Sequence, residues 1–191
     1  MTAIRLETPH THLRLVREED AAFVVEARQG GARTRFLHAV GDDVEKQRAF
    51  IRGSLERTAQ GAEYYFVIEA KTESEPRPVG LLRLTEVTAE SFVIGSWVTV
   101  PDCPVFAGIE SFFAACDFGF GSLGCAKYIA EIKPGNARRM AFHERMKSRE
   151  LGRFGECERF EQPLAGYLEA RRRYRKYVCS DELPPRLGER R

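Results

Sequence analysis

Residues 93–101 read V-I-G-S-W-V-T-V-P, residues 106–132 read F-A-G-I-E-S-F-F-A-A-C-D-F-G-F-G-S-L-G-C-A-K-Y-I-A-E-I, and residues 135–146 read G-N-A-R-R-M-A-F-H-E-R-M. The two runs rich in branched residues predict strands at 91–100 and 127–132. Between them an apolar stripe with helical spacing predicts a helix; its members are Phe106, Ile109, Phe113, Cys116 and Phe120. A second helix begins at Asn136, a favoured N-cap residue. Strand, helix, strand and helix form a crossover unit, so a ligand is expected near the carboxyl ends of the strands.

The flanking sequence predicts further helices and strands around this unit. The run Y-Y-F-V-I-E-A at 64–70 is aromatic and branched, and two more β runs follow it at short intervals, which favours an antiparallel meander. The other expected elements, in chain order, are a strand at 13–16, a helix starting at 17, a helix capped by Asp43, two short strands within 150–163 and a helix at 164–178. Residues 1–178 are therefore expected to form one domain, and residues 179–191, which contain Pro184 and Pro185, a flexible tail.

Composition excludes several classes of protein. The chain has 191 residues, enough for one domain with a proper core, and its net charge of +2 favours no nucleic-acid partner. The basic cluster within 171–176 is interpreted as a solvated helix face, with phosphate binding as the minority alternative. No apolar run reaches membrane-spanning length. The five cysteines contain no C-x-x-C pair, so we expect no disulfide framework, no metal site, and reduced thiols in the cytoplasm. The protein is expected to be a monomer or a homodimer.

Three local motifs carry a resemblance to a known family. They are I-G-S-W-V-T-V-P at 94–101, F-x-x-L-G-x-x-K-Y at 120–128 and N-A-R-R-M-A-F-H-E-R-M at 136–146. Together with the order of elements over roughly residues 13–163, they resemble the GCN5-related N-acetyltransferases (GNAT), most closely the branch that modifies protein N-termini and amino-sugar nucleotides. The resemblance implies an α/β (α+β) domain whose mixed, mostly antiparallel sheet splays between its fourth and fifth strands, with helices on both faces.

The resemblance also implies acetyl-CoA as cosubstrate and a loop that holds its pyrophosphate. That loop aligns with Cys103–Gly108, where only Gly108 matches the family's glycine pattern, so the loop is degenerate. Pro104 has no N–H to offer, and Phe106 has a large side chain where glycine would allow close approach, but the amides of Val105 to Gly108 still lie at a positive helix end. The residues expected to contact the cofactor are Trp97, Val98, Thr99, Val100, Val105, Phe106, Ala107, Gly108, Ile109, Ser111 and Asn136.

Acyl transfer to an amine needs a deprotonated amine, a polarised thioester and an acid for the leaving thiolate. His143 lies seven residues after Asn136, where many family members have a tyrosine thought to protonate the thiolate, and a histidine can do this near neutral pH. The competing interpretation is a surface or half-buried histidine on an amphipathic helix. Ser96 is the second catalytic candidate, as a ligand of the amine or of a bridging water. Glu110 is expected to face the acceptor or solvent, because a carboxylate would repel phosphate.

The resemblance implies a primary amine as the acceptor, either a small molecule such as an amino-sugar nucleotide, which is slightly favoured, or the N-terminus of a protein or peptide. The segment between the first two helices contains Arg33, Arg35, Phe36 and His38, which would suit a phosphorylated sugar group or an acidic peptide. Two other functions compete with this one. In the first, the fold is a catalytically impaired binding module, and in the second it is an acyltransferase that uses another acyl carrier.

Overall fold

The computed structural model describes residues 4–29, 34–37 and 41–188. In chain order the elements are β1 (Arg5–Glu7), β2 (Thr11–Leu15), η1 (Glu18–Asp20), α1 (Ala21–Arg28), α2 (Val44–Ala59), β3 (Tyr64–Ala70), β4 (Arg77–Thr85), β5 (Ser91–Thr99), α3 (Ala107–Asp117), η2 (Phe118–Ser122), β6 (Lys127–Ile132), α4 (Ala137–Arg145), β7 (Arg149–Phe154), β8 (Cys157–Pro163), α5 (Leu164–Arg173) and η3 (Arg175–Tyr177).

The strands form one eight-stranded sheet in the order β1-β2-β3-β4-β5-β6-β8-β7. Every neighbouring pair is antiparallel except β5 and β6, which are parallel and are joined by α3. The predicted mixed, mostly antiparallel sheet is therefore confirmed. Its fourth and fifth predicted strands correspond to β5 and β6, because the single strand expected at 13–16 is a hairpin of β1 and β2.

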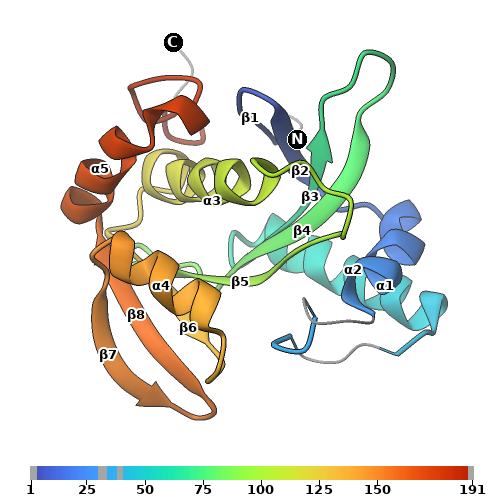
Figure 1. Ribbon diagram of the computed structural model, residues 1–191. Helices are drawn as coiled ribbons and strands as arrows, with labels where there is room; N and C mark the ends of the chain where they lie inside the picture. Colours follow the sequence, from blue (N-terminus) through green and yellow to red (C-terminus); the bar gives the residue numbers. More distant parts are fainter. Residues whose placement is uncertain (1–3, 30–33, 38–40, 189–191) are drawn as a thin grey trace.

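Helices cover both faces of the sheet, as predicted (Figure 1). Alternation along β3 divides the core in two: Phe66 and Ile68 face the cluster that contains α3, whereas Tyr65 and Val67 face the cluster that contains α1 and α2. The α3 side holds the larger core, with Phe92, Phe112, Phe113, Phe118 and Tyr128 among its most deeply buried residues. Gly119 is needed there, because a Cβ at this position would lie 2.4 Å from the ring of Phe92.

Local capping explains where the helices begin. The Asp43 carboxylate accepts a hydrogen bond from the Lys46 amide, so it caps α2 as expected, and the Asn136 side chain does the same for α4. The two strands expected within 150–163 are confirmed as β7 and β8. Beyond η3, Leu187 donates its amide hydrogen to the Ser122 carbonyl, and Arg186 lies beside Gly124. The division into a domain and a flexible tail stays a prediction.

Candidate functional site

The centre of the candidate site is the point at which β5 and β6 separate. Their parallel pairing runs from Ser91 and Lys127 to Ile94 and Ala130, whereas β5 continues along β4 to Thr99 and has no described strand on its other side beyond Ile94. β6 meanwhile continues along β8 to Ile132. The backbone of β5 beyond Ile94 therefore presents an edge to the gap, and an extended ligand could pair with it as an added strand would.

The first turn of α3 lies beyond the end of β5. The Ala107 amide donates to the Pro104 carbonyl and the Glu110 amide to the Phe106 carbonyl, but no described acceptor receives a hydrogen bond from the amides of Val105, Phe106 or Gly108. Val105 is 96% exposed, and a Cβ on Gly108 would meet only the Trp97 ring, at 3.9 Å. Free amides at a positive helix end suit an anion such as a phosphate group.

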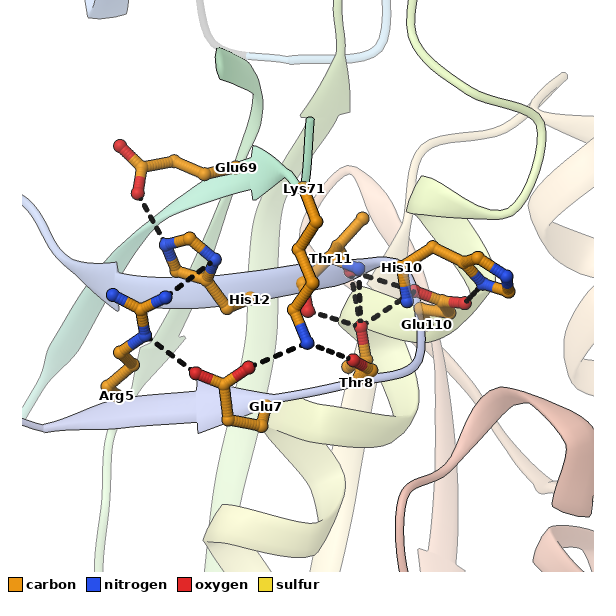
Figure 2. A network of polar contacts seen from close by, with 9 residues as sticks. All are labelled: Arg5, Glu7, Thr8, His10, Thr11, His12, Glu69, Lys71 and Glu110. Atoms are coloured by element: carbon orange, nitrogen blue, oxygen red, sulfur yellow. Dashed lines mark hydrogen bonds and ion pairs between the residues drawn. The ribbon is translucent and has the colours of Figure 1, made fainter. Parts of the chain in front are cut away.

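Glu110, on the first full turn of α3, is fully buried, so the expectation that it faces the acceptor or solvent is wrong. Its Oε2 atom accepts hydrogen bonds from the hydroxyls of Thr8 (2.6 Å) and Thr11 (3.0 Å) and from the His10 amide (3.2 Å), and its Oε1 atom lies 2.7 Å from His10 Nδ1 (Figure 2). The His10 ring also packs on the Phe106 ring, with centroids 4.3 Å apart. The turn between β1 and β2 thus fastens the N-terminal end of α3.

Trp97 bridges the two helices that flank the gap. Its indole N–H donates to the Ser111 hydroxyl of α3 over 3.2 Å, and its ring packs against Phe112 and Phe142. On the other side, the guanidinium carbon of Arg139 lies 5.0 Å from the ring centroid. Trp97 is therefore partly core and partly a wall of the gap. Val98 and Thr99 of β5, and then Val100, follow Trp97 in the direction of α3; they too were predicted to contact the cofactor.

Ser96 faces the opposite side of the sheet. The register of β4 and β5 shifts between Leu81 and Arg83, and Ser96 takes a positive φ of 46° in β5 opposite this irregularity. Its hydroxyl accepts a hydrogen bond of 3.0 Å from Arg28 of α1. Consecutive residues at the bulge thus contact α1 on one face and α3 on the other.

His143 lies in the core, 0% exposed, against the rings of Phe160, Tyr128 and Phe112. Its Nδ1 atom is 3.4 Å from both the Tyr128 and Ser148 hydroxyl oxygens. Burial, together with the positive charge of nearby Arg139, lowers the pKa of His143 to about 3. The imidazole is therefore neutral at pH 7, and any catalytic contribution must come from the neutral ring.

Sequence reasoning did not single out Arg139, which follows the Asn136 cap by three residues. The residue as a whole is half-buried, yet its Nε and Nη2 atoms are inaccessible to solvent and donate to no acceptor in the described part of the chain; the Nε2 atom of His143 is in the same situation. Burial lowers the pKa of Arg139 to about 10, so the side chain stays cationic at neutral pH. Its position in a motif that otherwise resembles a family pattern was the only available signal.

A basic hollow lies near the predicted acceptor segment. Its volume is about 590 Å³, and it is lined by Arg35, Phe36, Lys133, Pro134, Gly135, Arg153 and Glu156. The Arg35 guanidinium packs on the Phe36 ring at 4.5 Å. Of the four residues predicted to bind the acceptor, Arg35 and Phe36 line this hollow, and Arg33 and His38 lie outside the described residues. Lys133, which follows β6, and Arg153 of β7 also line the hollow, but the sequence did not predict them as acceptor-binding residues.

Other classes of site find no support in the described ranges. No group of three or more His, Cys, Asp or Glu side chains there could hold a metal ion. Cys116 is buried among core residues, which raises the pKa of its thiol well above the usual value and makes it a poor nucleophile. None of the helices described has the length and apolar character needed to cross a membrane.

Comparison with known proteins adds independent findings. The family model described as acetyltransferase (GNAT) domain matches residues 10–149. A solved structure described as apo FdhC, a nucleotide-linked sugar GNAT, is 27% identical with a TM-score of 0.80, covering 92% of this chain and 99% of its own. RimJ of Mycobacterium smegmatis in complex with CoA-disulfide (20% identity, TM-score 0.71; 93% and 96% covered) and the spermidine N-acetyltransferase SpeG of Vibrio cholerae (16%, 0.64; 83% and 96%) share the fold. The search of curated proteins gives no match.

Proposed function

Because the chain belongs to the GNAT acetyltransferase family, we propose that it transfers an acetyl group from acetyl-CoA to a primary amine. The observation that carries the proposal is the separation of β5 from β6 after Ile94 and Ala130, with the first turn of α3 at the far end of β5. This arrangement offers an extended backbone edge and a positive helix end in one line. A pantetheine arm and its pyrophosphate need those two features in that order.

The residues fit this cosubstrate in spite of the degenerate loop. The amides of Val105, Phe106 and Gly108 would hold the pyrophosphate, and Gly108 leaves space over the Trp97 ring. Ala107, Ile109 and Ser111 lie on the same turns, and the edge of β5 would pair with the arm. Asn136 satisfies an amide of α4, so its contact with the arm would be additional to its role as a cap.

The reaction itself requires few protein side chains. The amine nitrogen attacks the thioester carbonyl carbon, the carbon–sulfur bond breaks toward sulfur, and the nitrogen loses a proton to solvent. Ser96, at the bulge and held by Arg28, is proposed to position the amine or a bridging water. His143 is proposed to contribute as a neutral hydrogen-bonding group, because its pKa of about 3 excludes an imidazolium at pH 7.

For the acceptor we propose an amine that carries a phosphate group, such as an amino-sugar nucleotide. Three cationic side chains and one aromatic ring line the hollow, which lies where the chain leaves β6, against a single carboxylate. Guanidinium groups bind phosphate oxygens in pairs, and the Phe36 ring could pack on a base or sugar. The similarity to FdhC, which is described as a nucleotide-linked sugar GNAT, supports the same class of acceptor. A protein N-terminus with acidic neighbours is the second candidate, supported by the same charges.

Replacing Arg35 and Lys133 together with alanine is expected to raise the KM for the anionic acceptor about 3–10-fold, since each exposed ion pair contributes about 0.2–1 kcal/mol. The affinity for acetyl-CoA should not change. Added salt should weaken acceptor binding to the wild type in the same direction, because charges at the surface are screened over about 10 Å at 0.1 M.

The assay follows released thiol with amino-sugar nucleotides, polyamines and short peptides as acceptors. Lys176→Ala is the control, because Lys176 is also exposed but belongs to the basic cluster near the C-terminus. A polyamine as best acceptor, or a double variant with wild-type KM, would contradict the anionic acceptor. The two rival functions are tested by thermal shift, because a ligand that binds the native state raises its unfolding temperature. Acetyl-CoA alone should raise the unfolding temperature of this protein. A protein that responds only to an acyl carrier protein, or to neither ligand, would support one of the rivals.

A further inference from the structure

Arg139 occupies an unfavourable position: its guanidinium packs over the Trp97 ring, but no carboxylate in the described part of the chain pairs with it. It lies in the first turn of α4, where the helix dipole disfavours a cation, and its buried Nε and Nη2 atoms donate to no described acceptor. A buried charge without an anionic partner is costly, and such groups are normally paired. An anion that arrives during function would supply the missing partner.

The surroundings of Arg139 place the guanidinium where β5 and β6 separate. It packs on Trp97 of β5, three residues past the last paired residue, and it interacts electrostatically with Tyr128 of β6 and with His143, one helical turn further along α4. His143 Nε2 is the second buried polar atom without a partner in this part of the structure. Two buried polar groups without a described partner thus lie four residues apart on one helix, and Arg139 contacts β5 beyond the point where it leaves β6.

We propose that Arg139 stabilises the negative charge on the thiolate that leaves in acyl transfer. This inference rests on the proposed function. When the carbon–nitrogen bond forms and the carbon–sulfur bond breaks, the electron pair goes to sulfur, and the resulting anion pairs with the guanidinium until solvent protonates it. The neutral His143 then needs only to donate a hydrogen bond, which agrees with its burial. A fixed cation in a site shielded from water stabilises developing charge without reorganisation.

The first test compares Arg139→Met, Arg139→Lys and the control Arg138→Met, whose arginine is exposed on the same helix. Arg139→Met should lower kcat about 10²–10³-fold, the usual effect of removing one group that stabilises charge in the transition state. Arg139→Lys, which keeps a positive charge, should recover part of the rate. The apo Arg139→Met protein should unfold at the same or a higher temperature, because a buried unpaired charge is removed. A merely structural arginine would instead lower the unfolding temperature and leave kcat of the folded enzyme unchanged.

The second test needs no acceptor. At pH 9 a thiol of ordinary pKa, about 8.5, is largely ionised, so the wild type should bind coenzyme A about 10-fold or more tightly than desulfo-coenzyme A. Arg139→Met should lose this preference and Arg139→Lys should retain it. If the wild type binds both ligands and Arg139→Met prefers coenzyme A over desulfo-coenzyme A as strongly as the wild type does, the role of Arg139 is overturned. It is also overturned if Arg139→Met raises only the KM for the acceptor. If the wild type binds neither ligand, the proposed function itself fails.

Discussion

Glu110→Ala is expected to lower the free energy of unfolding by about 1–3 kcal/mol, the usual cost of leaving buried hydrogen-bonding groups without their acceptor. The substitution removes the carboxylate that accepts hydrogen bonds from the buried Thr8 and Thr11 hydroxyls, whereas the His10 side chain, 57% exposed, keeps its access to water. It also releases the turn between β1 and β2 from α3 (Figure 2). Urea denaturation followed by circular dichroism measures the change.

The control for this prediction is Glu90→Ala, because Glu90 is exposed in the turn before β5 and should change stability by no more than about 0.5 kcal/mol. Glu110→Gln keeps the shape of the side chain and should lie between the two. Since Glu110 also fixes the turn that carries the free amides, the glutamine variant should bind acetyl-CoA more weakly than wild type. A loss of stability below about 1 kcal/mol in Glu110→Ala would show that the network does not hold α3.

His143 should make the stability of the fold depend on pH. Its folded-state pKa is lowered to about 3 from a usual value of 6.5, so the unfolded chain takes up a proton first as the pH falls. Its contribution to stability is therefore fully present above pH 6.5 and is lost between pH 6.5 and 3, at a slope of up to roughly 1.4 kcal/mol per pH unit.

The measurement is urea unfolding at several pH values for wild type and His143→Phe, in which the ring is kept and the titration removed. Carboxylates titrate in both proteins, so the difference between the two curves isolates His143. The free energy of the wild type should fall more steeply from about pH 6.5 downward than that of the variant. Parallel curves would mean that His143 is accessible to solvent in the folded protein, and the imidazolium role in catalysis would then be open again.

The sequence was sufficient for the features that depend on local patterns. Alternating and helical spacing predicted the crossover unit from β5 to α4, and the caps at Asp43 and Asn136 followed from short-range hydrogen-bonding preferences. The hairpin of β1 and β2 was missed in part because its strand Arg5–Glu7 has only three residues. Such a short strand has no periodic signal, and its pairing partner, not its own composition, decides its structure.

The site depended more on contacts between distant parts of the chain. The partners of Glu110 lie about 100 residues earlier, so its charge alone suggested exposure, and the structure buries it instead. Arg139 was missed because an arginine on an amphipathic helix normally faces solvent. His143 was singled out by its position relative to Asn136, but its burial, which sets its protonation state, depends on rings from β6, β8 and α3.

Isothermal titration of acetyl-CoA into the wild-type protein tests most directly whether the gap between β5 and β6 and the first turn of α3 form a cosubstrate site. Saturable binding of one molecule per chain is expected, with modest affinity because Pro104 and Phe106 replace the family's loop residues. Phe106→Gly should bind more tightly if it stays folded, since Phe106 narrows the approach to the amides. Absence of binding at millimolar acetyl-CoA in both proteins would contradict the account.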